Sequence, residues 1–328
     1  MIEQHLTNAR NADAALYFEG PPGIGKTARI EAWAETNNLL CHTIIGSTLD
    51  PTDLGVPLNS DGKLEWVLPY WAHELAEKGG VLFLDELTSV PPAVLAAMQR
   101  IILEKRLHHK NLKDTFIVAA GNPAEYATSG AELPPAVIGR LHIVQLTPQG
   151  LLDDWLLWML QKGAAHAKVA AFLKSRQDLA CDTRNMSKPF PSFRSWDRAA
   201  NFLKNNVTDI AGSVGSGAAT EFLAWAKTLD LPTPEELFSG AKKLPSRLDS
   251  MFAAIGSCVA FASGHNFSIE IQQGYHKVFG NTPADLRIIS AEALLKAVRS
   301  TGKPLDIPGL IASGIVSNAD EVQKLLAQ

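Results

Sequence analysis

The sequence predicts an α/β protein whose first half is a parallel β-sheet covered by helices and whose second half is helical. Apolar segments of strand length recur through the first half and alternate with helix-like stretches. After Thr147 the periodicity of apolar residues becomes helical. Strands and helices in alternation are typical of βαβ units, which build a parallel sheet with helices against its faces.

Five apolar segments are the expected strands, and they end at Gly20, Ile45, Glu86, Asn122 and Leu146. Their apolar residues are mostly continuous rather than alternating, as expected for strands that are buried on both faces of a parallel sheet. The helix-like stretches between them run over residues 27–36, 70–77 and 92–104.

The helical second half is interrupted by clusters of Gly, Pro and Ser at 187–192 and 231–233. A chain of 328 residues is longer than one compact domain usually is. We therefore expect an α/β domain over residues 1–147, a helical lid over 148–205 and a further helical segment over 206–328.

Composition and charge exclude several classes of protein. The hydrophobic content of 46% indicates a folded globular chain, and the net charge of −4 gives no overall attraction to nucleic acid or anionic lipid. The scattered Cys41, Cys181 and Cys258 form neither a disulfide framework nor a metal-binding pair, which favours a reducing compartment. The chain lacks the apolar core of a signal peptide and an apolar run of membrane-spanning length, so we expect a cytoplasmic protein.

The clearest motif is a GxxxxGK[ST] loop between the first expected strand and the first expected helix. Its residues are Gly20, Pro21, Pro22, Gly23, Ile24, Gly25, Lys26 and Thr27. Glycines let the backbone wrap around phosphate oxygens, and the following helix presents its N-terminus to the same anion. In this pattern Lys26 reaches the β- and γ-phosphates, and the Thr27 hydroxyl ligates Mg²⁺. The strand–loop–helix context favours a phosphate loop over a chance glycine-rich turn.

Two carboxylates, Asp85 and Glu86, end the third expected strand. Ligands of α/β folds bind at the carboxyl ends of the strands, so both groups are expected near the phosphate loop. Asp85 is suited to hold the Mg²⁺ shell through water, and Glu86 is suited to orient and deprotonate an attacking water. A solvated acidic strand end is the alternative.

Asn122 follows the fourth expected strand and precedes Pro123. Its side-chain amide can both donate and accept hydrogen bonds, as the positioning of a water beside a γ-phosphate requires. An Asn-Pro turn needs no function, so this residue alone decides nothing.

The order of these motifs resembles AAA+ ATPases, and in particular the MoxR family. Residues 50–55 resemble the family's insertion before its second helix, and residues 97–99 resemble the helix after its acidic strand. Residues 106–114 lie where the family carries a β-hairpin before its sensor residue. The similarity extends over residues 15–205 and implies a P-loop NTPase sheet domain of the AAA+ class, an all-α lid and a further helical C-terminal segment.

The resemblance also implies roles for single residues. Asn122 matches the sensor-1 residue, and Arg140 matches the arginine finger that reaches a γ-phosphate held by a neighbouring subunit. A structural salt bridge is the alternative for Arg140. Arg194 matches sensor 2, which contacts the nucleotide from the lid, and Arg198 lies one turn further along the same helix as the second candidate.

MoxR-like ATPases form hexameric rings that hydrolyse ATP with Mg²⁺ and remodel or activate a protein client, typically with a von Willebrand factor A domain protein. The resemblance therefore implies a chaperone-like ATPase that assembles with itself. The chain departs from the family pattern in a short hairpin and at Gly139, Leu141 and Phe193, where the family usually has Asp, Phe and a small residue or Pro. These departures leave the nucleotide chemistry intact and put the partner surface in doubt.

Two other functions remain open. A nucleic-acid motor would use the basic residues of the hairpin region, although no aromatic residue is interleaved with them to stack on bases. These residues are Lys105, Arg106, Lys110 and Lys113. An ATP-gated scaffold that rarely turns over would need neither Glu86 nor Arg140.

Three further patterns are interpreted as structural. The glycines at 212–217 follow no strand and precede no Lys, so we expect a helix or turn. His108 and His109 lack a partner at metal-ligand spacing and are expected as solvated hairpin residues. The tryptophans at helical positions are expected to pack the lid and C-terminal helices; they are Trp155, Trp158 and Trp225.

Overall fold

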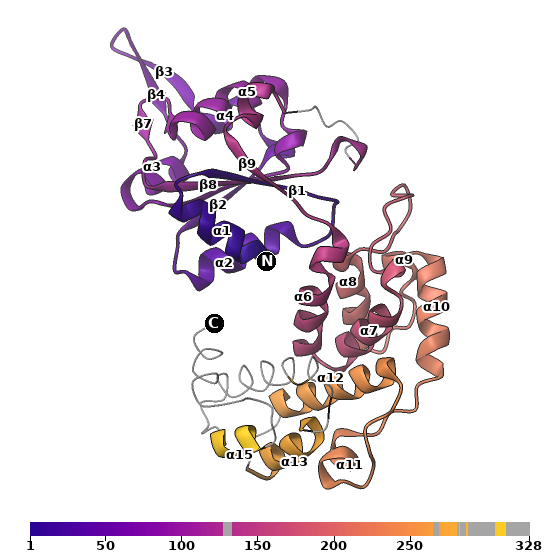
Figure 1. The fold of residues 1–328 in the computed structure, drawn as a ribbon. Helices are drawn as coiled ribbons and strands as arrows, with labels where there is room; N and C mark the ends of the chain where they lie inside the picture. Colours follow the sequence, from indigo (N-terminus) through magenta and orange to yellow (C-terminus); the bar gives the residue numbers. More distant parts are fainter. Residues whose placement is uncertain (127–132, 265–268, 281, 283–286, 288–305, 313–328) are drawn as a thin grey trace. The chain divides into compact units, whose positions relative to one another are not determined.

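The computed structural model describes residues 1–126, 133–264, 269–280, 282, 287 and 306–312. The chain forms two compact units, residues 1–151 and 152–328. The predicted fold class is confirmed, because the first unit is a helix-covered parallel sheet and the described part of the second unit is helical (Figure 1). The expected division into 1–147, 148–205 and 206–328 stays a prediction, and part of its last segment lies outside the described residues.

The sheet of the first unit has five parallel strands in the order β2, β5, β8, β1, β9. In that order the strands run over Cys41–Ile45, Gly80–Asp85, Thr115–Gly121, Ala15–Glu19 and Leu141–Gln145. All five predicted strands are present, and each ends at the predicted residue or one residue before it. The carboxyl ends of β5, β8 and β1 are neighbours, so the residues that follow these strands come together at one edge.

Burial differs between inner and edge strands. The inner strands β1, β5 and β8 are buried along nearly their whole length, as predicted. The prediction is wrong for β2 and β9, where Ile45 is 47% and Ile143 is 39% exposed. Both strands lie at an edge of the sheet, where a strand has only one neighbour and its faces are less completely covered.

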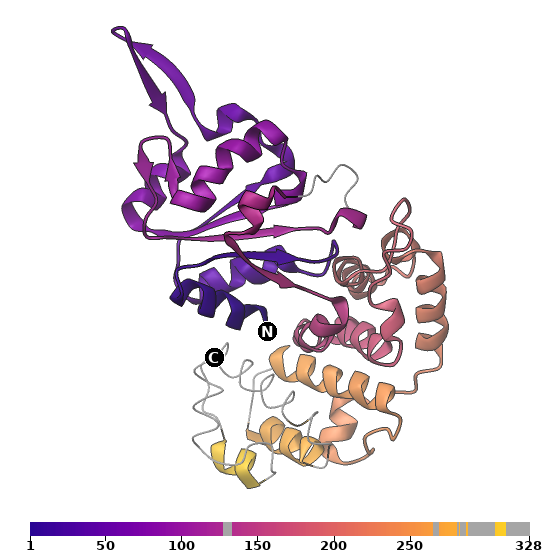
Figure 2. The same ribbon diagram turned by 45° about the horizontal axis from the view of Figure 1, so that its top comes forward.

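Helices cover both faces of the sheet. The helices α1 and α2 lie on one face, and α4 and α5 lie on the other (Figures 1 and 2). Helix α3 joins the second group, because its buried residues share one core with those of α4 and with Tyr17 and Leu84 of the sheet. The α-helices of this unit are α1 (Ile2–Asn11), α2 (Lys26–Thr36), α3 (Tyr70–Lys78), α4 (Pro92–Glu104) and α5 (Pro135–Ile138). Single turns of 3₁₀ helix are η1 (Gly46–Thr48), η2 (Pro51–Leu54), η3 (Leu87–Ser89) and η4 (Ala124–Tyr126).

Two antiparallel hairpins extend the first unit. The predicted one is short and pairs β6 (Arg106–Leu107) with β7 (Lys110–Asn111). A larger one that we did not predict pairs β3 (Val56–Ser60) with β4 (Lys63–Val67) and projects from the unit (Figure 2). Its turn is Asp61-Gly62, both with positive φ, as tight hairpin turns require. The Trp66 ring stacks on His108 with ring centroids 3.8 Å apart, so the two hairpins are in contact.

The described part of the second unit consists of helices. They are α6 (Pro148–Gln161, which begins in the first unit), α7 (Ala164–Ser175), α8 (Phe193–Lys204), α9 (Ala211–Val214), α10 (Ser216–Lys227), α11 (Pro234–Ser239), α12 (Leu248–Gly264), α13 (Ile269–Phe279) and α15 (Ile307–Ala312), with one 3₁₀ turn, η5 (Gln177–Leu179). The predicted breaks precede capped helices, because the side chain of Ser192 caps α8 and that of Thr233 caps α11. The residues at 212–217 form α9, a turn and the start of α10, as predicted. Within the described ranges, no helix has both the length and the apolar character to cross a membrane.

An aromatic cluster forms the core of the second unit. Phe172 of α7 contacts Trp196 of α8 and both Phe222 and Trp225 of α10. The packing predicted for Trp225 is therefore confirmed. The prediction for Trp158 is wrong, because this side chain is 44% exposed. The Lys162 ammonium lies over the Trp158 ring, 4.0 Å from its centroid. A cation, rather than a neighbouring helix, therefore contacts this exposed ring.

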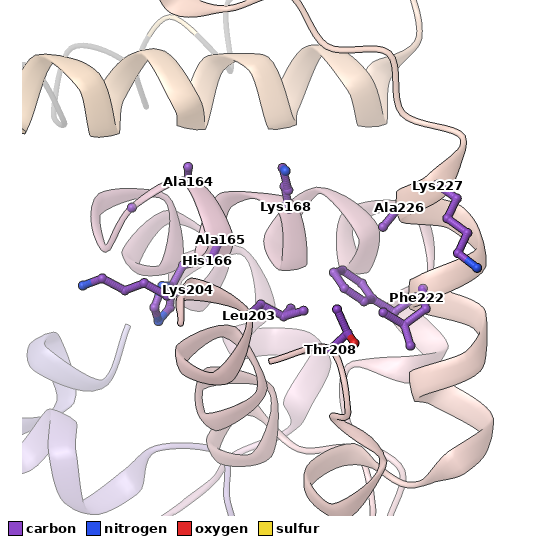
Figure 3. A pocket seen from close by; sticks show the side chains of 12 residues that line it. Ala164, Ala165, His166, Lys168, Leu203, Lys204, Thr208, Phe222, Ala226 and Lys227 are labelled. Atoms are coloured by element: carbon purple, nitrogen blue, oxygen red, sulfur yellow. The ribbon is translucent and has the colours of Figure 1, made fainter. Parts of the chain in front are cut away.

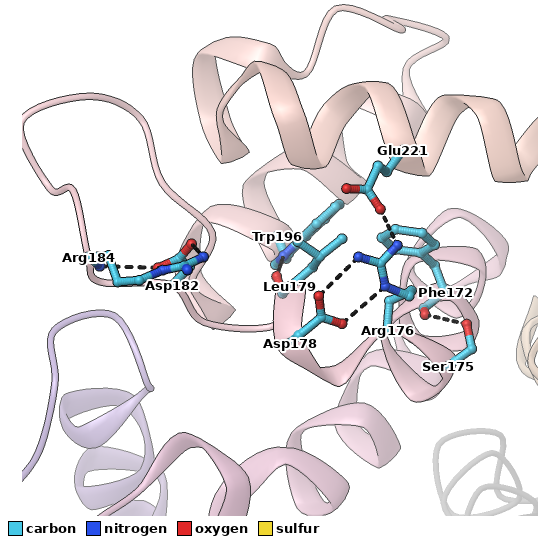
Figure 4. A network of polar contacts seen from close by, with 9 residues as sticks. All are labelled: Phe172, Ser175, Arg176, Asp178, Leu179, Asp182, Arg184, Trp196 and Glu221. Carbon is cyan, nitrogen blue, oxygen red and sulfur yellow. Dashed lines mark hydrogen bonds and ion pairs between the residues drawn. The ribbon is translucent and has the colours of Figure 1, made fainter.

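Polar contacts attach the segment 176–184 to the helices beside it (Figure 4). The Arg176 guanidinium donates hydrogen bonds to Asp178 and to Glu221 of α10. The Trp196 indole N–H donates to the carbonyl oxygen of Leu179 at 2.7 Å. The hydrogen bonds to Asp178 and Glu221 raise the pKa of Arg176, so its charge is fixed.

Candidate nucleotide-binding site

The glycine-rich loop connects β1 to α2 and has the backbone geometry of an anion cradle. Gly23 and Gly25 have φ of 79° and 91°, a region that glycine adopts without strain. Gly25 is also the N-cap of α2 and supplies no side-chain cap to that helix. The N–H groups of the first helical turn are therefore left to bind an anion.

The Lys26 ammonium points back into this loop. The residue is only 8% exposed. Its Nζ donates to the carbonyl oxygens of Gly20 and Pro21 at 2.6 and 3.0 Å, and to Asn122 Oδ1 at 2.9 Å. A buried ammonium needs such acceptors, and phosphate oxygens are acceptors of the same kind.

Thr27 and Asp85 lie in direct contact although they are far apart in the sequence. The Thr27 hydroxyl donates to Asp85 Oδ2 at 2.6 Å, and Asp85 Oδ1 accepts from the Glu86 backbone N–H at 2.9 Å. A hydroxyl and a carboxylate side by side are the oxygen donors that Mg²⁺ prefers, so the residues present fit that ion. The structure thus brings the acidic strand end to the glycine-rich loop.

Glu86 has a backbone conformation that is uncommon for a residue with a side chain. Its φ of 54° and ψ of 39° lie in the left-handed region. Ser47 Oγ donates a hydrogen bond to Glu86 Oε2. The sequence interpretation missed Ser47, although a signal exists: it follows β2, and β2 is the neighbour of the strand that ends at Asp85.

Asn122 is held by its backbone as well as by Lys26. Its N–H donates to Thr88 Oγ1 at 3.3 Å, and the Thr88 hydroxyl donates to the Asn122 carbonyl oxygen at 3.2 Å. Thr88 is a second positioning residue that the sequence interpretation missed. The site is tightly packed at the preceding residue, because a Cβ at Gly121 would lie 2.4 Å from the hydroxyl oxygen of Tyr17. Burial, with a smaller contribution from Glu19, raises the pKa of Tyr17, so that hydroxyl stays neutral.

Arg140 has no hydrogen bond or ion pair to this cluster within the described residues. It is exposed and follows α5, and its Nη1 donates to the carbonyl oxygen of Ala136 at 3.0 Å. Within the described residues it forms no ion pair, so the alternative of a structural salt bridge finds no support there. Its guanidinium therefore keeps most of its donors exposed.

Arg194 is the second residue of α8, and Arg198 lies one turn later. Both side chains are exposed. The Ser192 and Ser195 side chains cap the helix start, which fixes the backbone that carries Arg194. Both arginines belong to the second unit, so their relation to the loop of the first unit stays a prediction.

Comparison with known proteins finds one family match, which lies within the first unit. Residues 15–141 match the family model of the AAA domain (dynein-related subfamily). A search of curated protein sequences gives no significant match. Similar solved structures include a variant of RuvB from Thermotoga maritima, with 16% identity and a TM-score of 0.42 over 99% of this chain and 84% of that chain. Another is NtrX from Brucella abortus in complex with ADP, with 14% identity and a TM-score of 0.41 over 92% of this chain and 67% of that chain.

The family match covers the glycine-rich loop, both acids, Asn122 and Arg140. It ends before the second unit begins. Over residues 15–141 the first unit is therefore similar to the AAA domain of the dynein-related subfamily.

Proposed function

We propose that this protein is an AAA+ ATPase that hydrolyses ATP at the cluster formed by the glycine-rich loop, Asp85, Glu86 and Asn122. The observation that carries the proposal is the contact between Thr27 and Asp85, with Lys26 and Asn122 in hydrogen-bond contact beside it. This contact joins the glycine-rich loop to the two carboxylates at the carboxyl end of β5, and Asn122 follows the neighbouring strand β8. Such a strand edge is where parallel α/β sheets bind their ligands.

Each residue has a defined task in this proposal. Lys26 and the N–H groups of the loop bind the phosphates, and Thr27 and Asp85 would hold Mg²⁺, which neutralises charge on the phosphate oxygens. Glu86 accepts a proton from the attacking water, and Asn122 orients that water through its amide. Thr88 positions Asn122, and the hydrogen bond from Ser47 restrains Glu86 until the carboxylate is needed.

We further propose that activity requires a ring of identical chains, expected to be a hexamer. Arg140 is exposed and free of ion pairs within the described residues, as a group that acts on a neighbour's γ-phosphate must be. A head-to-tail interface that repeats and closes gives a ring. Arg194 is proposed to contact the nucleotide from the second unit, with Arg198 as the second candidate.

The finer proposal is a MoxR-like ATPase that remodels a protein client with a von Willebrand factor A domain partner. Its support is the resemblance in sequence together with the β6–β7 hairpin, which lies where that family carries a hairpin before its sensor residue. The nucleic-acid motor is less well supported, because Lys105 of the basic cluster forms an ion pair with Asp13. The carboxylate of Asp13 offsets the positive charge that this lysine would offer to a phosphate. Stimulation of ATP hydrolysis by DNA or RNA at moderate salt would favour the motor.

The test is ATP hydrolysis by the full chain, compared with Glu86→Gln and Lys26→Ala. A general base contributes about 10²–10⁴-fold to rate, so Glu86→Gln is expected to reduce turnover by that factor while ATP binding and ATP-dependent assembly persist. Lys26→Ala is expected to abolish nucleotide binding. Unchanged turnover in Glu86→Gln would contradict the role of this residue, and tight binding by Lys26→Ala would contradict the phosphate loop. Wild-type protein that assembles on ATP without hydrolysing it would support the scaffold instead.

A further inference from the structure

The second unit contains a pocket that plays no part in the proposed ATPase site. Its volume is about 520 Å³, within the range of about 300–1,000 Å³ that is usual for ligand sites. It is formed by the N-terminal end of α7 and the C-terminal halves of α8 and α10. Apolar side chains form its floor, among them Leu203 and Phe222, which point toward one another (Figure 3).

Three lysines surround this floor. Lys168, Lys204 and Lys227 extend on three sides of it (Figure 3). All three are exposed, and none has an ion pair or side-chain hydrogen bond within the described residues. By contrast, Lys162 and Lys174 of the same unit pair with aspartates. These lysines therefore give the pocket an excess of positive charge, although the net charge of the chain is −4.

Helix dipoles explain only part of this arrangement. Lys204 and Lys227 lie in the last turns of α8 and α10, where a cation is favourable without any ligand. Lys168 is the fifth residue of α7, beyond its first turn, so the helix dipole does not account for a cation at this position.

The start of α7 adds two further features. Its N-cap is Gly163, which supplies no side-chain cap, so the first N–H groups of the helix are left to bind an anion. His166 lines the pocket and is only 1% exposed. Its Nε2 lies 3.3 Å from Asp197 Oδ1, and its Nδ1 has no hydrogen-bond partner within the described residues. A buried nitrogen without a partner costs free energy, which a polar ligand group would recover.

We infer that this pocket binds an acidic segment of a partner protein, with an apolar side chain on the Leu203–Phe222 floor and carboxylates on the surrounding lysines. The ammonium groups belong to three different helices and do not converge on one point (Figure 3). This spacing suits several carboxylates along a peptide better than a single small anion. All the residues involved lie in the second unit, so the inference does not rest on ATP hydrolysis.

The experiment measures binding of a defined probe to the full chain, without nucleotide. The probe is a fluorescein-labelled octapeptide that alternates Glu and Asp with Leu and Phe, and anisotropy reports its affinity. The double variant Lys204→Glu/Lys227→Glu is expected to bind the peptide at least tenfold more weakly than wild type. The matched control Lys188→Glu/Lys243→Glu makes the same charge change at exposed positions of this unit outside the pocket and is expected to bind as wild type does.

A second measurement needs no variant. A carbodiimide joins carboxylates to lysines in contact with them, so peptide cross-linked to the wild-type chain is expected at Lys168, Lys204 or Lys227 when the digest is analysed by mass spectrometry. Three results would overturn the inference: equal binding by both double variants, cross-links spread over other lysines, or no binding. Binding of single-stranded DNA or anionic vesicles through the same lysines, but not of the peptide, would also overturn it.

Discussion

The Thr27 hydroxyl donates a 2.6 Å hydrogen bond to Asp85 across 58 residues of sequence. The strand order makes this contact possible, because only β8 lies between the strand before Thr27 and the strand that ends at Asp85. Asn122, which follows β8, completes the group through its bond to Lys26. One edge of the sheet thus gathers a hydroxyl, an ammonium, an amide and two carboxylates.

Removal of the Thr27 hydroxyl is expected to weaken nucleotide binding only when Mg²⁺ is present. Thr27→Ala loses one oxygen ligand, so its affinity for ATP with Mg²⁺ should fall at least about tenfold. With a chelator present, variant and wild type should bind ATP alike. Calorimetric titration of both proteins under both conditions makes the comparison. Thr27→Ser keeps the hydroxyl and serves as the control, and a loss of equal size without Mg²⁺ would contradict the assignment.

Ser47 is expected to restrain Glu86. Its hydrogen bond occupies the carboxylate that must accept a proton from water, so Ser47→Ala should raise basal ATP turnover. A hydrogen bond to a charged group contributes about 1.5–3 kcal/mol, which sets an upper bound of roughly 10–100-fold on the increase. Steady-state ATPase assays measure it, with Ser47→Thr as the variant that keeps the hydroxyl. A lower turnover in Ser47→Ala would mean that the bond holds Glu86 in its active position.

Gly121→Ala is expected to disturb the site through contact with Tyr17. The added Cβ would lie 2.4 Å from the Tyr17 hydroxyl oxygen and 3.1 Å from Thr88 Oγ1. Overpacking of this kind typically costs about 1–3 kcal/mol and shifts the backbone, here immediately before Asn122. We expect a lower unfolding free energy and a lower turnover.

Tyr17→Phe supplies the matched test of that prediction. It removes only a hydroxyl that has no hydrogen-bond partner within the described residues. In the Gly121→Ala background it should restore part of the lost stability and turnover, as measured by urea unfolding and ATPase assays. Absence of any recovery would show that another contact causes the defect.

Arg140 is expected to act on a neighbouring chain rather than on its own. Arg140→Ala and Glu86→Gln should each be inactive alone, but a mixture contains sites with an intact Glu86 next to an intact Arg140. In an equimolar random ring about one site in four has this combination, so about a quarter of wild-type turnover should return. ATPase assays of the mixture, with each variant alone as control, measure the recovery. A mixture as inactive as its components would exclude action between subunits.

The Ser192 cap is expected to stabilise the second unit. Ser192→Ala removes the acceptor for the Ser195 N–H and should lower the unfolding free energy by about 1 kcal/mol, as for other helix caps. Ser192→Gly should cost only a few tenths of a kcal/mol. Urea unfolding followed by circular dichroism gives both values. Ser187→Ala, at an exposed position outside the helices, is the control, and an equal loss there would contradict the capping role.

The sequence predicted the five strands and the residues at their carboxyl ends because those signals are local. A glycine-rich loop between a strand and a helix, or two acids after a buried strand, can be recognised without knowing the strand order. The importance of Ser47 and Thr88 depends on which strands and turns are neighbours, and periodicity does not contain that information. The β3–β4 hairpin escaped notice because most of its residues are exposed, so no alternation of buried and exposed positions marked it.

The stack of Trp66 on His108 has a mechanical consequence for that hairpin. A hairpin attached to the unit only at its base would be free to tilt. Here the Trp66 ring, near the base of the β3–β4 hairpin, packs against His108 in the turn of the β6–β7 hairpin. An aromatic contact contributes about 0.5–1.5 kcal/mol, and tilting the hairpin would first require breaking it. The projection is thus braced against the β6–β7 hairpin, which precedes the strand that leads to Asn122.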